Sequence, residues 1–151
     1  GSMGLEAISR GAAYARLVDA DPKVIEVLKR NVATLGVEDR AAVVGGSATE
    51  PLNWRAPAGE PPRWADCVLF DPPYPWLADE RRVELMRSVT RLMEEVLRPG
   101  GLLVFHTPRR GVQESDFEER FEPDRRGYGS SALWYLRAEE EPEEAAAEDE
   151  A

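Results

Sequence analysis

Residues 66–74, Asp-Cys-Val-Leu-Phe-Asp-Pro-Pro-Tyr, constrain the fold most, because an apolar run stops there at two consecutive prolines. Proline has no backbone N–H and a fixed φ, so a strand that reaches Asp71 cannot continue in a sheet. Asp71, Pro72, Pro73 and Tyr74 therefore predict a stiff corner that fixes carbonyl oxygens, a carboxylate and an aromatic ring. Such a corner suits a planar group that carries an amine, such as a stacked nucleobase. An ordinary proline-rich turn fits the same residues.

Length and composition limit the class of protein. The chain has 151 residues, of which 42% are hydrophobic, enough for one domain with a sizeable core. No apolar stretch is long enough to span a bilayer and no secretory leader opens the sequence, so we expect a cytoplasmic protein. We also expect it to be a monomer. The single cysteine, Cys67, excludes an internal disulfide, and with one histidine, His106, we expect no metal site.

The acidity of the chain is concentrated at its end. The net charge is −10, but eight of the 29 acidic residues lie in residues 139–151, which contain no Lys or Arg. The remainder carries 21 acidic and 19 basic residues and is nearly neutral. Because residues 138–151 lack branched apolar and aromatic side chains, we predict a disordered acidic tail there. The tail is either solubilising or a regulatory, partner-binding segment.

Short apolar strands and amphipathic helices alternate along the predicted chain, which indicates an α/β fold. Asp21 is a predicted N-cap, Pro22 the first helical residue and Gly36 the C-terminal cap of the surest helix. The spacing predicts helices over 4–10, 22–35 and 79–97, and strands over 15–18, 41–44, 65–70 and 102–106. Segments 117–121 and 132–136, separated by a Gly-rich turn at 127–129, predict an antiparallel hairpin at the sheet edge.

Polar residues follow three of the predicted strands. Asp19, Ser47 and Asp71 each stand at a carboxyl end, where open α/β sheets bind their ligands. The opening residues Gly1, Ser2, Met3 and Gly4 precede a helix. They are either the last part of a glycine-rich ligand loop or the remnant of a cleaved expression tag.

In their order and spacing, several segments resemble the RsmD-like methyltransferases, which use S-adenosylmethionine to methylate the exocyclic N2 of a guanine in small-subunit (16S) ribosomal RNA. The resemblance runs from residue 1 to about 137, implying a Rossmann-like methyltransferase domain over 1–137. Its segments are Gly1 to Ala12, Leu-Val-Asp-Ala-Asp at 17–21, Asn31, Phe-Asp-Pro-Pro-Tyr at 70–74, Leu-Arg-Pro-Gly-Gly-Leu at 97–102 and Arg-Gly-Tyr-Gly at 126–129.

The resemblance implies a binding site for S-adenosylmethionine. The loop Gly1, Ser2, Met3 and Gly4 would lie against the methionine moiety, and Asp19, with Ala20 beside it, would accept hydrogen bonds from the ribose. Near the adenine the family usually has Gly-Asp-Ala, whereas this chain has Gly46, Ser47 and Ala48. The adenine would then be held by the Ser47 hydroxyl or by backbone amides.

The resemblance also implies that the 71–74 corner acts on the target base. The Asp71 carboxylate and the Pro72 carbonyl would accept hydrogen bonds from the guanine amine, while Tyr74 stacks on the flipped base. The substrate would be small-subunit ribosomal RNA or an assembling 30S particle. Trp76 is either a second apolar wall or a packing residue. We interpret His106 as a capping or packing residue.

Two departures from the family pattern lead to other interpretations. No central strand with an Asp-x-Phe-x-Gly segment precedes Gly1, and the basic region that the family uses for RNA contact is not seen. We therefore expect a methyltransferase truncated at its amino end. The alternatives are a non-catalytic Rossmann-like remnant, or an enzyme that methylates an amine of a DNA base or a protein glutamine amide.

Overall fold

The computed structural model describes residues 1–141. Its helices are α1 (Ser2–Ser9), α2 (Pro22–Leu35) and α3 (Arg82–Arg91), and α3 continues into a π-helical turn, η3 (Leu92–Val96). Its strands are β1 (Ala15–Asp19), β2 (Ala41–Gly45), β3 (Ala65–Phe70), β4 (Leu97–Pro108), β5 (Asp124–Tyr128) and β6 (Ser131–Arg137). Short 3-10 turns complete the described chain: η1 (Pro51–Trp54), η2 (Tyr74–Leu77), η4 (Glu114–Asp116) and η5 (Glu119–Phe121).

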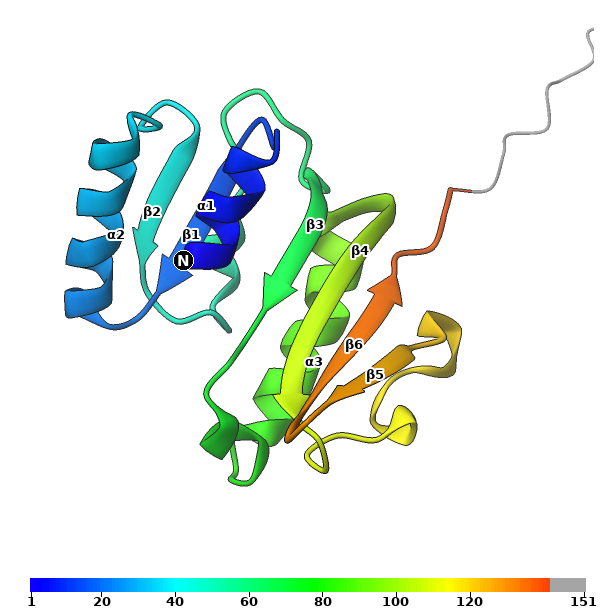
Figure 1. Cartoon of the computed structure of the whole chain (residues 1–151). Helices are drawn as coiled ribbons and strands as arrows, with labels where there is room; N and C mark the ends of the chain where they lie inside the picture. The colour runs from blue at the N-terminus through cyan, green and yellow to red at the C-terminus, as the bar shows by residue number, and fades with distance from the viewer. Residues whose placement is uncertain (142–151) are drawn as a thin grey trace, which may run out of the picture.

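The strands form two sheets. β1 and β2 pair in parallel, while the second sheet has the order β3-β4-β6-β5, parallel between β3 and β4 and antiparallel elsewhere. The prediction of parallel strands followed by an antiparallel hairpin is confirmed. In Figure 1 the sheets stand side by side, with β1 and β3 as neighbouring edges that no strand of the described residues joins. The predicted lack of a central strand therefore takes the form of a gap between β1 and β3.

The helix over 22–35 has the predicted ends. The Asp21 side chain accepts a hydrogen bond from the Lys23 amide at 2.8 Å, Pro22 is the first helical residue, and Gly36 has a φ of 64°. A φ of that sign favours glycine, so the helix ends there. Leu28 and Val32 are the buried residues of its inner face.

The long helix predicted over 79–97 is shorter. α3 begins at Arg82, and β4 already starts at Leu97, where it pairs with Ala65. The register then shifts, so that Cys67 pairs with Leu102. The segment between Leu97 and Leu102 thus forms an irregular start of β4 rather than a separate loop.

The first strand of the predicted hairpin was misplaced. Phe117 and Phe121 are buried, but they anchor 3-10 turns, and the paired strand is β5. Every β5 residue is exposed, so the strand lacks the apolar alternation by which a sequence signals a strand. The second hairpin strand, predicted over 132–136, is confirmed as β6.

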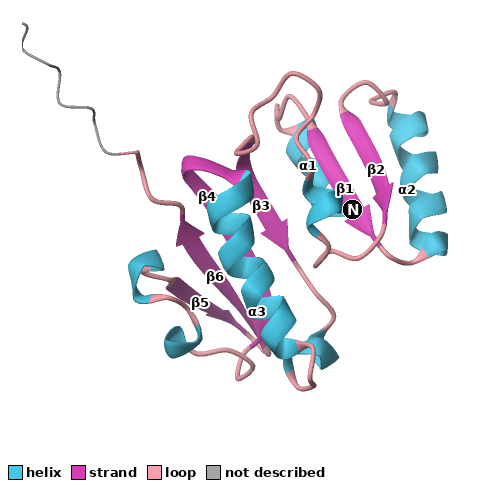
Figure 2. Cartoon of the chain, turned by 180° about the vertical axis from the view of Figure 1, so that it is seen from behind, coloured by secondary structure: helices cyan, strands magenta, loops and turns pink. Residues whose placement is uncertain are grey.

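Each sheet has its own hydrophobic core. The smaller core, under β1 and β2, consists of Ile8, Leu17, Leu28, Val32 and Ala41. The larger core lies between the second sheet, α3 and the 3-10 turns, and its fully buried side chains include Trp134, Phe105, Leu85 and Leu103. Figure 2 shows α3 across β3 and β4, whereas α2 lies beside β2 and α1 lies against β1.

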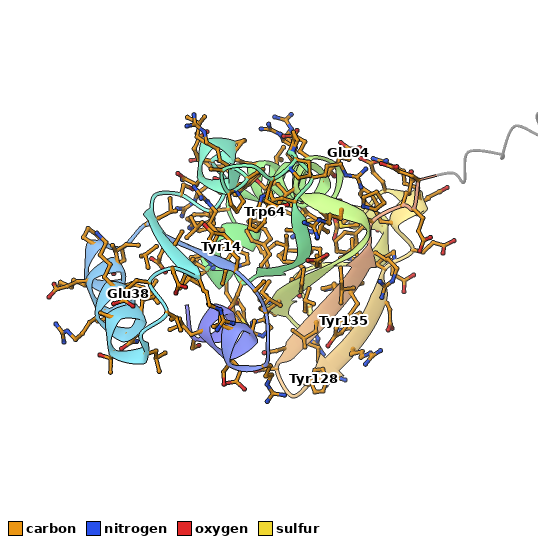
Figure 3. The ribbon with its side chains drawn as sticks, turned by 90° about the horizontal axis from the view of Figure 1, so that it is seen from above. Tyr14, Glu38, Trp64, Glu94, Tyr128 and Tyr135 are labelled. Carbon is orange, nitrogen blue, oxygen red and sulfur yellow. The ribbon has the colours of Figure 1, made fainter. Side chains whose placement is uncertain are left out.

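The sheets are joined at the amino ends of their edge strands. The rings of Tyr14, before β1, and Trp64, before β3, meet edge to face with centroids 5.8 Å apart (Figure 3). Arg16 Nε donates to the Asn53 carbonyl at 2.7 Å. These contacts set the position of the smaller sheet beside the larger one.

The ordered body extends slightly past the predicted domain end. Ala138 is buried, its amide donates to the Gly101 carbonyl at 2.8 Å, and its carbonyl accepts from Gly100 at 3.1 Å. Of the acidic tail predicted over 138–151, residues 142–151 lie outside the described part. Among the described residues, no helix has both the length and the apolar character needed to cross a membrane.

Candidate active site

The corner at residues 71–74 follows directly from the end of β3 at Phe70. Pro72 is buried, whereas Asp71 and Tyr74 are exposed. Pro73 has an extended backbone, with φ −56° and ψ 130°, and its carbonyl accepts from the Trp76 amide at 3.1 Å. Among the described residues no donor reaches the Pro72 carbonyl. The corner therefore presents one unused carbonyl and one carboxylate at a strand end.

The pairing of β3 with β4 places a histidine beside this corner. Phe70 lies opposite Phe105 in the parallel register, so the residues that follow them, Asp71 and His106, are neighbours. His106 Nδ1 is 2.8 Å from Asp71 Oδ1, and His106 Nε2 is 3.1 Å from the Tyr74 hydroxyl. The imidazole thus connects the Asp71 and Tyr74 side chains of the corner.

Ser131, the first residue of β6, extends this network. Its Oγ lies 3.0 Å from the Tyr74 hydroxyl. One proton arrangement satisfies every member: Ser131 donates to Tyr74, Tyr74 donates to Nε2 of a neutral His106, and Nδ1–H of His106 donates to Asp71. The Tyr74 ring is therefore held in one direction by its hydroxyl.

Sequence reasoning missed the role of two of these residues. His106 was interpreted as a capping or packing residue, but both of its ring nitrogens face the corner. Ser131 carried no signal, because it belongs to a strand that returns from elsewhere in the chain. Aligning the apolar runs of the third and fourth strands would have revealed His106, since each run has a phenylalanine just before its polar residue. Trp76 packs against the larger core with Arg81 over its ring, which favours a packing role.

The carboxyl end of β1 forms a second group of predicted residues. Asp19 is half-buried, and its Oδ1 accepts from the Asp21 amide at 2.9 Å. No donor among the described residues reaches its other oxygen, Oδ2. The Asp19 carbonyl accepts from the Gly46 amide at 2.9 Å, which ties the ends of β1 and β2 together. Ala20, which follows, is exposed.

The opening residues are helical rather than a loop. α1 starts at Ser2, with Gly1 as its N-cap, because the Gly1 carbonyl accepts from the Leu5 amide at 3.2 Å and closes the first turn. Ser2, Met3 and Gly4 therefore stand in the first turn, where backbone N–H groups have no partner within a helix. Figures 1 and 2 both place this amino end of α1 at the carboxyl end of β1, the strand whose last residue is Asp19.

Gly4 is needed for the packing of α1. A Cβ atom at this position would lie 2.2 Å from Leu17 Cδ2, in the small core. Glycine therefore allows the helix to lie directly on β1. The close approach brings the first turn of α1 to the end of that strand.

The residues after β2 are engaged with each other. Ser47 Oγ lies 2.9 Å from Thr49 Oγ1 and accepts from the Thr49 amide at 3.2 Å. Ala48 packs against the larger core, and its carbonyl accepts from Trp54 Nε1 at 2.9 Å. A ligand at this position would meet a hydroxyl that already has a partner.

The two groups of residues stand on different sheets. Asp19 ends β1 and Asp71 follows β3, and among the described residues no hydrogen bond joins their side chains. A depression of about 590 Å³ lies around Trp54 and Arg63, and another of about 550 Å³ lies around Arg109 and Arg125. Neither depression has Asp19 or Asp71 among its lining residues.

Comparisons of sequence give a consistent result. The profile of a family described as conserved hypothetical protein 95 matches residues 1–137. The chain is 35% identical over 97 residues to ribosomal RNA small subunit methyltransferase D of Escherichia coli K12, covering 64% of this chain and 46% of that protein. With the protein of the same name from Buchnera aphidicola, it is 32% identical over 74 residues, covering 49% of this chain and 36% of that protein. The chain spans less than half the length of these curated relatives.

Solved structures share its fold. A Haemophilus influenzae protein, provisionally described as a methylase, aligns with a TM-score of 0.70 at 23% identity over 93% of this chain and 81% of its own. An Escherichia coli protein, provisionally described as a methyltransferase, aligns with a TM-score of 0.70 at 26% identity over 93% and 71%. An RNA methyltransferase from Salinibacter ruber, solved with S-adenosyl-L-homocysteine, aligns with a TM-score of 0.60 at 19% identity. The alignment covers 95% of this chain and 78% of that protein.

Proposed function

The chain belongs to the RsmD-like methyltransferase family, described as conserved hypothetical protein 95, and from this membership we propose that it methylates the exocyclic N2 of a guanine in small-subunit (16S) ribosomal RNA. Its fold is that of the class I methyltransferases. The observation that carries the proposal is the corner at 71–74, where His106 fixes a carboxylate and an aromatic ring at one strand end.

S-adenosylmethionine is the methyl donor that this family membership implies. The residues at the end of β1 fit its polar groups, because Asp19 offers a half-buried carboxylate oxygen for a ribose diol. The amides of Ser2, Met3 and Gly4, in the first turn of α1, would receive the methionine carboxylate. When bound, the cofactor supplies an electrophilic methyl group on a sulfonium, which is a good leaving group.

The corner would prepare the target amine. A guanine amine is a weak nucleophile, because its lone pair is delocalised into the ring. Hydrogen bonds from its two N–H groups to the Asp71 carboxylate and the Pro72 carbonyl would favour a pyramidal nitrogen with its lone pair toward the methyl group. Tyr74 would stack on the base and hold it in line. His106 keeps both Asp71 and Tyr74 in place, so catalysis depends mainly on positioning.

Two measurements test this proposal. Calorimetric titration with S-adenosylhomocysteine measures whether the folded chain binds the cofactor product. Incubation with labelled S-adenosylmethionine and small-subunit particles, followed by nucleoside mass spectrometry, identifies the methylated atom. We expect N2-methylguanosine. Methylation of adenine, cytosine or a glutamine amide would instead show that guanine is not the substrate and would identify the group that is methylated.

The open gap favours one competing function. The residues proposed for the cofactor and those proposed for the base stand on separate sheets, and this separation supports the alternative of a Rossmann-like module that binds a partner without catalysing transfer. A chain that is folded by circular dichroism but gives no heat with S-adenosylhomocysteine would support this non-catalytic function. Binding of the ligand would exclude it.

A further inference from the structure

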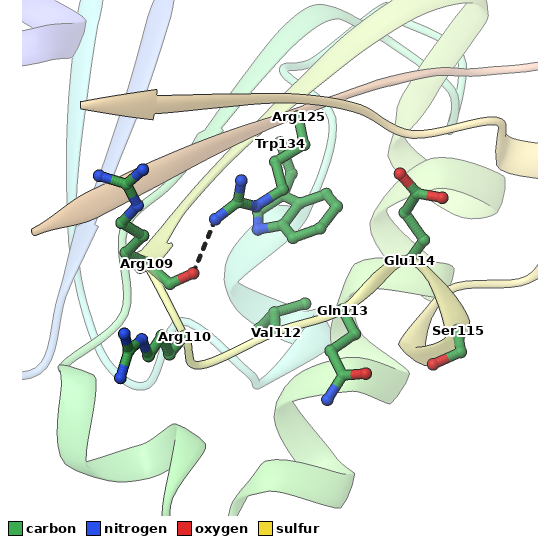
Figure 4. A pocket seen from close by; sticks show the side chains of 8 residues that line it. All are labelled: Arg109, Arg110, Val112, Gln113, Glu114, Ser115, Arg125 and Trp134. Carbon is green, nitrogen blue, oxygen red and sulfur yellow. Dashed lines mark hydrogen bonds between the residues drawn. The ribbon is translucent and has the colours of Figure 1, made fainter. Parts of the chain in front are cut away.

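Three arginines surround a depression near the candidate active site. Arg109 and Arg110 follow β4, and Arg125 lies on β5 (Figure 4). We call these three residues the arginine cluster. The depression has a volume of about 550 Å³, and the buried Trp134 lies behind Arg125. The rest of its lining is Val112, Gln113, Glu114 and Ser115.

Neutral groups hold two members of the arginine cluster, Arg109 and Arg125, in place. Arg109 Nη1 donates to the Gly129 carbonyl at 3.1 Å, and Arg125 Nη2 donates to the Arg109 carbonyl at 2.8 Å. The Arg125 guanidinium also lies 5.6 Å from the centre of the Trp134 ring. Carbonyls and an aromatic face orient a guanidinium without cancelling its charge.

Nearby carboxylates are committed to other arginines. Asp116 binds Arg82 at 2.8 Å, and Asp124 binds Arg126 at 3.1 Å. Glu114 is the one carboxylate among the lining residues. Within residues 1–141, no member of the arginine cluster forms an ion pair. The surface therefore carries uncompensated positive charge on an acidic chain.

The arginine cluster stands next to the corner that would hold the base. The Arg109 amide donates to the Ser130 carbonyl at 2.8 Å, and the following residue, Ser131, contacts the Tyr74 hydroxyl at 3.0 Å. Both sites therefore lie at the carboxyl end of β4, where His106 also stands. A polymer with its base at Tyr74 would have its backbone within reach of these arginines.

We infer that the arginine cluster binds phosphodiester groups of the RNA strand that carries the target base. The inference rests on the proposed function and adds the surface on which the substrate docks. Guanidinium groups match phosphate oxygens in geometry and charge, and such contacts position an RNA without reading its sequence. The exposed Tyr128 at the hairpin tip offers a ring for a neighbouring base.

The test measures RNA binding without a methyl donor. A fluorescein-labelled, single-stranded oligoribonucleotide containing one guanine is titrated with wild-type chain at several salt concentrations. The variants are Arg109→Gln, Arg110→Gln, Arg125→Gln and the triple variant. Arg30→Gln is the matched control, because it removes the same charge from α2, at the far end of the molecule from β5 (Figure 1). Circular dichroism verifies that each variant is folded.

Each phosphate contact with single-stranded RNA contributes about 0.7 to the slope of log K against log salt. We expect the triple variant to lower the slope by about 2, each single variant by about 0.7, and Arg30→Gln by nothing measurable. An unchanged slope in the folded triple variant would overturn the inference, as would equal loss with Arg30→Gln or no binding by the wild-type chain. Failure of methyl transfer leaves this measurement unaffected, so the two proposals fail separately.

Discussion

His106 Nδ1 lies 2.8 Å from Asp71 Oδ1, across the ends of two neighbouring parallel strands. The contact turns a proline-rich corner into a fixed site, because the other ring nitrogen of His106 holds the Tyr74 hydroxyl at 3.1 Å. The carboxylate and the ring that we propose to hold the target base, Asp71 and Tyr74, are therefore both held by His106. His106 can therefore be substituted while Asp71 and Tyr74 are left unchanged.

Replacing His106 by Ala should lower kcat for methyl transfer roughly 10- to 100-fold, because a hydrogen bond to a charged group contributes about 1.5–3 kcal/mol. His106→Gln, which can keep one of the two contacts, should give an intermediate value. The KM for S-adenosylmethionine and the melting temperature should stay unchanged. A loss of cofactor affinity with normal kcat would contradict the positioning role.

The two groups of the corner can be separated by substitution. We expect Asp71→Ala and Tyr74→Ala to abolish methyl transfer in active protein, while S-adenosylhomocysteine binding measured by calorimetry persists. Tyr74→Phe keeps the ring but loses the hydroxyl contacts with His106 and Ser131, so activity should fall only several-fold, in proportion to about 1 kcal/mol. Near-normal turnover by Tyr74→Ala would exclude stacking on the base.

Asp19 and Asp21 form a matched pair for testing cofactor binding. Asp19→Asn should weaken S-adenosylhomocysteine binding about tenfold or more, since a charge-assisted hydrogen bond to the ribose becomes a neutral one. Asp21→Asn should leave binding intact, because Asp21 caps α2, and Asn caps equally well. Calorimetry on both variants decides the matter. Equal effects would remove Asp19 from the cofactor site.

The two hydrophobic cores should unfold separately. All four tryptophans, Trp54, Trp64, Trp76 and Trp134, belong to the larger core or pack against it, so tryptophan fluorescence follows mainly that core, with Trp64 also in contact with Tyr14. Far-ultraviolet circular dichroism follows both, and we expect its urea transition to differ from the fluorescence transition. Leu28→Ala should cost about 2–5 kcal/mol and move only the circular dichroism curve. Coincident curves for the wild type would show one cooperative unit.

Cys67 reports on the environment of β3. Cys67 is exposed as a whole residue, but its thiol is partly buried. This burial is the larger cause of a raised pKa of Cys67, and the nearby Asp66 carboxylate is the smaller cause. A raised pKa leaves less thiolate at neutral pH, so iodoacetamide should react more slowly with the folded chain than with the unfolded chain, and faster as pH rises. Asp66→Asn should increase the rate at fixed pH. A rate equal to that of the unfolded chain would contradict the raised pKa.

The sequence predicted the ends of α2 and β3, because capping residues and prolines act within a few residues of their own position. The ends of α2 follow from Asp21, Pro22 and Gly36, and β3 has the predicted bounds because two prolines stop it. β5 could not be predicted in the same way, since all its residues are exposed and show no apolar alternation. Exposed edge strands carry little pattern of their own.

The sequence predicted which residues stand at the candidate site but not which of them contact each other. The position of Asp71 follows from the sequence, whereas its contact with His106 depends on the register between β3 and β4. The gap beside β1 was expected, but the separation of Asp19 from Asp71 is a property of the whole arrangement. Registers and gaps are set by tertiary packing, which a single sequence does not display.

The unpaired edges of β1 and β3 have a consequence for handling the protein. Each edge presents backbone N–H and C=O groups that can template an added strand. Leu69 and Cys67 are exposed on β3, so a strand that pairs there also gains apolar contacts. We therefore expect copies of the chain to associate by intermolecular strand addition at these edges. This association should increase with protein concentration. It should decrease when a short extended peptide pairs with the free edge of β1 or β3.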